Sequence, residues 1–184
     1  MSISVENEQS AEHRLMLEQI PEKLGIDFVP LIFSKFTDNP ERLFHIWKLV
    51  EAMLFKGILH RLTKEMVVVV TANVKKCQYC SIAHKAFAKN LGLSEELVDC
   101  LDGNLKTMEP APTRHLLQFA RSLASDVEFD SEIKYKQLIA DGFSQQELDE
   151  LVFSVGVASL ISTLANGMEL NNLADPGFKK ILNT

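Results

Sequence analysis

This sequence has few cysteines, no long apolar run and no excess of positive charge, and each absence argues against one class of protein. Three cysteines among 184 residues are a small and odd number, which does not suggest the disulfide framework of a secreted protein. No apolar run approaches the roughly 18 residues that a membrane span needs, and the polar, acidic start lacks the apolar stretch of a signal peptide. With 19 basic against 25 acidic residues, the chain offers no basic surface for nucleic acid. We therefore expect a cytoplasmic protein that binds neither membrane nor nucleic acid.

The rest of the composition is that of an ordinary globular chain, and its patterns favour helices. Hydrophobic residues make up 46% of the chain, and its length suits one domain over residues 1–184, with residues 1–12 disordered. Helix starts are marked by Asn39-Pro40-Glu41 and by the capping box Ser144-Gln-Gln-Glu147. Gly92 marks a helix end, because glycine readily adopts the left-handed conformation found there.

One segment, Met66-Val-Val-Val-Val-Thr-Ala72, is ambiguous between strand and helix. Its β-branched residues are typical of a buried strand, and a strand before a C-x-x-C motif would suggest a thioredoxin-like arrangement. No second strand-like run occurs elsewhere in the chain. We therefore predict a buried helix over residues 64–76 and an all-α fold, with burial outweighing the local propensity.

The pattern that points to chemistry is Cys77-Gln-Tyr-Cys80 followed by His84. The spacing i, i+3 and i+7 places all three side chains on one face of a helix. Two thiols held that close can exchange between dithiol and disulfide, and an imidazole one turn beyond Cys80 can take its proton. The thiolate is the reactive form, and a helix N-terminus or a nearby base favours it. The motif therefore indicates redox chemistry.

The same residues also allow plainer interpretations. A zinc site would need a fourth ligand beside Cys77, Cys80 and His84, which His60 or His115 could supply, but three ligands along one straight helix suit a tetrahedral site poorly. Two inert core cysteines would fit the spacing as well. Taken alone, His84 would be an ordinary helix histidine and Glu65 a helix-start carboxylate, paired with Lys64.

The third cysteine, Cys100, lies in the apolar stretch Leu97–Leu101 with no histidine or lysine beside it. A buried thiol in such surroundings is inert. We expect Cys100 to be structural.

The string Lys64-Glu65-Met66, with Cys77 twelve residues after Glu65 and C-x-x-C-x-x-x-H ending at His84, resembles the alkylhydroperoxidase-D-like, carboxymuconolactone decarboxylase-like superfamily. Its thiol-active, peroxidase-related branch is the most similar, and the resemblance covers about residues 26–170. The flanking segments that also match are Asn39–Leu54, Gly57-Ile-Leu59, Gly142–Glu147 and Leu164–Gly167. The resemblance implies an all-α helical bundle with the C-x-x-C at the start of a central helix.

It also implies an antioxidant thiol peroxidase, or disulfide oxidoreductase, that reduces hydroperoxides without a cofactor or metal. Cys80 would be the peroxidatic thiol, Cys77 the resolving thiol, His84 the base, and Glu65 the group that orients and polarises the relay. A dithiol would reduce the enzyme, which would be a homo-oligomer, a trimer or a hexamer. The decarboxylase branch works without the cysteine pair, so Cys77 and Cys80 argue against a lactone decarboxylase. A small-molecule decarboxylase-like enzyme on the same scaffold is kept as one alternative. A non-catalytic helical oligomer whose cysteines form a redox switch is another.

Two departures from the family pattern stand out. Tyr79 replaces the second histidine of the proton relay in alkylhydroperoxidase D, which shortens the relay. Ser159 and Ser162 stand where many relatives carry asparagines.

Overall fold

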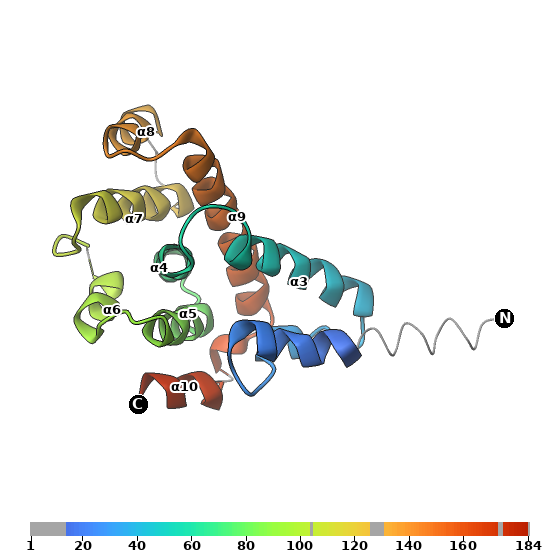
Figure 1. Cartoon of the computed structure of the whole chain (residues 1–184). Coiled ribbons are helices and arrows are strands. Elements are labelled where there is room, and N and C mark those ends of the chain that lie inside the picture. The colour runs from blue at the N-terminus through green and yellow to red at the C-terminus, as the bar shows by residue number, and fades with distance from the viewer. Residues whose placement is uncertain (1–13, 104, 126–130, 173–174, 184) are drawn as a thin grey trace. The chain divides into compact units, whose positions relative to one another are not determined.

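A computed structural model describes residues 14–103, 105–125, 131–172 and 175–183 (Figure 1). Every regular element in these ranges is a helix, so the all-α prediction is confirmed. The expected disorder of residues 1–12 lies outside them. The contacts within the chain group it into two compact units, Met1–Glu51 and Ala52–Thr184. The prediction of a single domain stays a prediction.

The first unit contains a helix over residues 14–24, the short helix α2 (Leu31–Ser34) and most of α3 (Pro40–Phe55). The sequence predicts that the first helix ends before Pro21, and this is wrong: the helix continues through it. Proline removes one helical hydrogen bond, but Ile20 and Leu24 on either side of it are buried, and their burial outweighs that loss. The predicted start of α3 is confirmed, since Asn39 Oδ1 accepts a hydrogen bond from the Arg42 amide at 3.0 Å.

The second unit is a set of helices around α4 (Arg61–Val74), which Figure 1 shows end-on with α5, α6, α7 and α9 about it. The elements after α4 are α5 (Gln78–Asn90), α6 (Glu95–Asp102), α7 (Ala111–Ala124), α8 (Ser131–Ala140), α9 (Gln145–Gly167), the 3-10 turn η1 (Leu170–Asn172) and α10 (Pro176–Leu182).

Central position explains why the β-branched run of α4 is helical. Val67, Val69, Val70 and Thr71 are all fully buried. A valine in a helix costs about 0.5 kcal/mol relative to alanine, whereas burying its side chain contributes about 1.5–3 kcal/mol. Because neighbouring helices cover α4 on several sides, burial wins at each position, and the predicted helix is confirmed.

The longest helix, α9, begins at the predicted capping box, in which Ser144 and Glu147 bond to each other's backbone amides. By length and composition it is the one helix in the described ranges that could cross a membrane, with a mean hydropathy of 1.6. Core helices of globular proteins pass the same test, and Leu148, Leu151 and Ala165 of α9 are fully buried in this unit. We interpret α9 as a core helix.

The last helix, α10, packs against α5. Phe178 is almost fully buried, with its ring edge-on to Phe87 and Tyr79 of α5, at centroid distances of 5.3 and 6.3 Å. Lys89 Nζ of α5 donates to the Leu182 carbonyl at 2.9 Å. The C-terminal helix thus covers one face of the helix that carries the cysteine motif.

Candidate active site

The two motif cysteines lie at the first turn of α5 and form a disulfide. Cys77 is the N-cap residue and Cys80 follows three residues later, with a Cα–Cα distance of 5.4 Å, within the range that a disulfide can bridge. Both are buried, and Cys77 Sγ accepts a hydrogen bond from the Cys80 amide at 3.2 Å. A sulfur in this position faces the positive end of the helix dipole, which favours a thiolate in the reduced protein.

Glu65 and His84 lie together, although they belong to different helices. Glu65 of α4 is fully buried, and its Oε2 is 2.5 Å from His84 Nδ1 on α5. The His84 side chain is 14% exposed, with its ring edge-on to Phe87 at 5.7 Å. Because Nδ1 faces the carboxylate, Nε2 is the nitrogen left to exchange a proton. The pair therefore has the form of an oriented base.

The sequence interpretation missed Arg61, which holds the other oxygen of Glu65. Arg61 Nε donates to Glu65 Oε1 at 2.5 Å, and the guanidinium lies over the Phe55 ring, 4.3 Å from its centroid. The two residues are four apart on α4, which is the spacing for a helical ion pair, so the pattern was readable. Each oxygen of the Glu65 carboxylate therefore has its own partner, Arg61 on Oε1 and His84 on Oε2. These contacts hold the side chain in place and compensate the buried charge.

His84 and Cys80 are one turn apart on α5, as the spacing predicts. In the part of the chain that the structure describes, no hydrogen bond joins His84 to either sulfur of the disulfide. Proton transfer between them would therefore need a side-chain rotation in the reduced protein or a bridging water.

Lys64 does not pair with Glu65, so that plainer interpretation is wrong. Its buried ammonium forms an ion pair with Glu150 of α9 and donates to the Lys56 carbonyl. Glu150 Oε2 also accepts from the amides of Ile58 and Leu59, at 2.7 and 3.1 Å. Burial raises the pKa of Glu150, but the hydrogen bonds from Lys64 and the two amides outweigh it and lower the pKa overall. We call Lys64 and Glu150 the latch, since they tie α9 to the start of α4.

Gly57 makes room for the latch. Its φ is +91°, a conformation that favours glycine, and an added Cβ would lie 2.3 Å from Glu150 Cδ. Both observations explain the glycine in the segment Gly57-Ile-Leu59.

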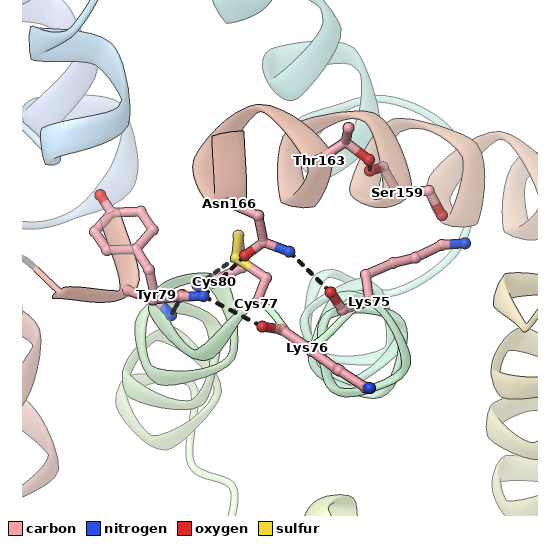
Figure 2. The surroundings of a disulfide bond; sticks show 9 residues. Lys75, Lys76, Cys77, Tyr79, Cys80, Ser159, Thr163 and Asn166 are labelled. Carbon is pink, nitrogen blue, oxygen red and sulfur yellow. Dashed lines mark hydrogen bonds between the residues drawn. A yellow bond between two sulfur atoms is a disulfide. The ribbon is translucent and has the colours of Figure 1, made fainter. Parts of the chain in front are cut away.

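Two asparagines to which the sequence interpretation gave no role hold the backbone around the cysteines, and Figure 2 labels one of them, Asn166. Asn166 Nδ2 of α9 donates to the Lys75 carbonyl at 2.8 Å. Asn171 Nδ2 of η1 donates to the Lys76 carbonyl at 3.2 Å and to Asn166 Oδ1 at 2.9 Å, and its Oδ1 accepts from the Tyr79 amide at 2.9 Å. We call Asn166 and Asn171 the asparagine clamp. Asn166 lies in the segment Leu164–Gly167 that matches the family pattern, but no local pattern indicates the role of either asparagine, because their backbone partners lie about ninety residues away.

The residues that depart from the family pattern have separate surroundings. Tyr79 is buried, with its ring against Phe178. Ser159 lies on α9, farther along the helix from the disulfide than Asn166 in Figure 2, and its carbonyl accepts from Thr163 Oγ1 at 2.9 Å. Ser162 is fully buried, and its hydroxyl has no hydrogen-bond partner among the described residues.

The remaining residues weighed in the sequence lie in other contacts. The His60 side chain caps α4 by accepting from the Leu62 amide, and His115 Nδ1 is 2.7 Å from an Asp141 oxygen. Cys100 is half-buried, with Sγ 3.1 Å from Thr107 Oγ1. Within the described ranges, no group of three or more His, Cys, Asp or Glu side chains could hold a metal ion.

Known proteins match this chain both in the sequence around the cysteine motif and in the fold. Residues 42–102, which include Glu65, Cys77, Cys80 and His84, match the model of the carboxymuconolactone decarboxylase family. No curated protein sequence matches the chain.

Solved structures extend the match along most of the chain. The alkylhydroperoxidase AhpD core of an uncharacterized peroxidase-related protein from Ralstonia eutropha JMP134 is 24% identical, with a TM-score of 0.77, covering 85% of this chain and 83% of that one. An uncharacterized peroxidase-related protein from Silicibacter sp. TM1040 is 25% identical, with a TM-score of 0.75 and coverages of 85% and 82%.

A third structure has the same fold at lower identity. A cysteine-to-alanine variant of the debrominase Bmp8, in complex with 2,3,4-tribromopyrrole, is 14% identical, with a TM-score of 0.77 and coverages of 91% and 87%. Together these matches confirm the resemblance to the alkylhydroperoxidase-D-like, carboxymuconolactone decarboxylase-like superfamily and its all-α helical bundle.

Proposed function

We propose that this protein is a thiol peroxidase that reduces hydroperoxides through Cys77 and Cys80. The observation that carries the proposal is the bridged cysteine pair at the first turn of α5, on the helix whose His84 is paired with the buried Glu65. The superfamily match and the peroxidase-related proteins of the same fold support it. A reversible dithiol of this kind suits a reducing compartment, so we propose the cytoplasm as its location.

The cycle has three balanced steps. In the first, the Cys80 thiolate attacks the O–O bond of the peroxide, becomes a sulfenic acid, and releases an alkoxide, which takes up one proton to become the alcohol. In the second, the Cys77 thiol condenses with that sulfenic acid to form the disulfide and one water. In the third, an external dithiol reduces the disulfide by exchange and leaves as its own disulfide.

In this cycle the chain's other residues handle protons and geometry. His84 takes the proton from the Cys80 thiol, directly or through a water, and returns one to the departing alkoxide. Glu65 holds the imidazole by its Nδ1, and Arg61 holds Glu65. Tyr79 packs on Phe178, so the proton path runs through His84 and does not use the position of the family's second histidine.

We also propose that the protein is a homo-oligomer, a trimer or a hexamer. Val152, Phe153 and Leu160 are large apolar residues on α9 that are 40–43% exposed in the single chain. Burying such a row against another copy would remove it from water. Light scattering should give a multiple of 20.7 kDa at micromolar concentration, and a monomer would contradict the proposal.

The test of the function is peroxide turnover with dithiothreitol, together with intact-mass measurement. The wild type should consume peroxide catalytically and lose about two mass units on oxidation, as two thiols become a disulfide. Cys80→Ser should abolish turnover, and Cys77→Ser should stop at the sulfenic acid. Cys100→Ala is the matched control, because Cys100 contacts Thr107 and not the motif, and it should behave like the wild type.

The other functions would give different results. A disulfide that forms and reopens without peroxide turnover would favour the redox-switch oligomer and contradict the peroxidase. An activity on a small carboxylic substrate that survives both Cys77→Ser and Cys80→Ser would favour the decarboxylase-like enzyme.

A further inference from the structure

We propose that Asn171 is a positioning residue that sets how readily the Cys77–Cys80 disulfide forms. The inference rests on the proposed redox use of this pair and goes beyond it, since it assigns control of the pair to a residue outside the motif.

Asn171 holds the backbone on both sides of Cys77. Its Nδ2 donates to the carbonyl of Lys76, the residue before Cys77, at 3.2 Å, and its Oδ1 accepts from the amide of Tyr79, two residues after, at 2.9 Å. A single side-chain amide therefore spans Cys77. Asn166 supports it by accepting from the same Nδ2 at 2.9 Å.

The residue that Asn171 holds before the motif has an unfavourable backbone. Lys76 has a φ of +54°, in the left-handed region that residues other than glycine and, less often, asparagine rarely adopt. The Lys76 amide donates to the Asn73 carbonyl at 3.2 Å, and the Lys76 carbonyl accepts from Asn171. Without Asn171, Lys76 can relax toward a commoner conformation, and Cys77 moves with it.

Asn171 also holds one of the first amides of α5. The Tyr79 amide goes to Asn171, and the Cys80 amide goes to Cys77 Sγ. These are two of the donors that a helix start leaves without an intrahelical partner. The hold on the Tyr79 amide involves neither sulfur, so it does not depend on whether the cysteines are bridged.

A fixed turn favours the disulfide over the dithiol. Reduction converts one disulfide and two glutathione thiols into two cysteine thiols and one glutathione disulfide, so the two electrons and two protons come from glutathione. In the bridged protein the Cα atoms of Cys77 and Cys80 are 5.4 Å apart, and we expect the clamp to keep them near this separation after reduction. Without it, the reduced loop gains conformations that must be lost again when the bond forms.

The expected shift of the redox equilibrium follows from the backbone freedom that one residue gains when the clamp is removed. Fixing one residue's backbone is worth about a factor of ten in an equilibrium constant. Asn171→Ala should therefore lower the ratio of disulfide to dithiol about tenfold at a fixed glutathione buffer, which is about 30 mV in reduction potential.

The experiment equilibrates the full chain in a series of glutathione buffers and reads the oxidised fraction by thiol labelling and intact mass. The matched control is Asn73→Ala. Asn73 Nδ2, on the neighbouring turn, also makes two hydrogen bonds, at 3.0 and 3.1 Å, but to Leu101 and Asp102 of α6. Asn73→Ala should lower the melting temperature and leave the redox equilibrium within twofold of the wild type.

A second variant covers the case in which Asn171→Ala fails to fold. Asn171→Asp keeps an acceptor for the Tyr79 amide but has no amide donor for the Lys76 carbonyl or for Asn166, so it should shift the equilibrium in the same direction. A folded Asn171 variant with an equilibrium within twofold of the wild type, or shifted no more than Asn73→Ala, would overturn the proposal. Loss of folding in both Asn171 variants would assign the residue to stability alone and overturn it too.

This measurement uses no peroxide. A shifted equilibrium in a protein without peroxide turnover would reject the proposed function and leave the role of Asn171 standing. Peroxide turnover with an unshifted equilibrium would do the reverse.

Discussion

Replacing Glu65 by glutamine, alone and together with Arg61→Met, separates the two tasks of this residue, since its carboxylate both stabilises Arg61 and orients His84. Glutamine has nearly the same shape but no charge. In the wild type, Oε1 of Glu65 accepts from Arg61 and Oε2 faces His84 Nδ1, both at 2.5 Å. The variant therefore removes the charge beside both partners and leaves the packing of α4 and α5 in place.

The loss of stability follows from the surroundings of Arg61. Removing one member of a buried ion pair destabilises a protein by about 3–5 kcal/mol. The Arg61 side chain is 20% exposed and lies over the Phe55 ring, so we expect the lower end, about 3 kcal/mol. For a chain of this length that corresponds to about 6–12 °C in melting temperature. Since domains are stable by about 5–15 kcal/mol, Glu65→Gln should still fold.

The loss of activity is a separate effect and should not recover when stability is restored. General acid–base assistance is typically worth 10²–10⁴-fold, so peroxide turnover should fall at least 10²-fold in Glu65→Gln. In Arg61→Met/Glu65→Gln both charges are gone, and replacing a buried pair by neutral groups is often nearly neutral for stability. The double variant should melt within a few degrees of the wild type and turn over as slowly as the single variant.

The assays are thermal melts by circular dichroism, peroxide consumption with dithiothreitol, and alkylation of reduced Cys80 by iodoacetamide at pH 7. If Glu65→Gln consumes peroxide and is alkylated at Cys80 at the wild-type rates, His84 does not need the carboxylate, and the proposed relay is wrong. Activity that returns in the double variant would mean that the single variant failed through stability alone.

Three other changes test the latch and the third cysteine. Glu150→Gln leaves the Lys64 ammonium buried without its ion pair and should destabilise the protein by about 3–5 kcal/mol in urea titrations. Because the fold lowers the pKa of Glu150, its stabilisation is complete above the unfolded carboxyl's pKa of about 4.3 and is lost as the pH falls through the folded pKa; the variant should lack this acid dependence. Gly57→Ala should lose about 2–3 kcal/mol, since its Cβ would meet Glu150, whereas the control Gly92→Ala, also at positive φ but with open space around it, should lose about 1 kcal/mol. Cys100→Ala should keep wild-type peroxide consumption, and a loss comparable to a motif cysteine would contradict its structural role.

The features that local patterns encode were predictable from the sequence. The start of α3 at Asn39 and the capping box at Ser144 are each set by a few neighbouring residues, and the structure has both. The common face of Cys77, Cys80 and His84 follows from helical spacing alone. The β-branched run of α4 needed one further argument, that no other strand-like segment was present to pair with it.

Contacts between distant segments were not predictable in the same way. Nothing in the spacing places Glu65 beside His84 across two helices, and only the resemblance to a known family suggested it. Asn171 and Gly57 act through partners far along the chain, so no nearby residue signals their role. Arg61 is different, since its spacing from Glu65 is that of an ordinary helical ion pair and it could have been found.

The sequence separation between the clamp and the cysteines has a consequence for the growing chain. Asn171 lies 92 residues after Tyr79, and at about 5–20 residues per second the ribosome needs roughly 5–20 s to add them. During that interval Cys77 and Cys80 exist in a nascent chain without the side chain that fixes their turn, and without the Phe178 ring that covers α5. Any thiol chemistry during that interval would take place on an unclamped motif, and only a chain that has been completed past Asn171 can hold the cysteine pair in its final geometry.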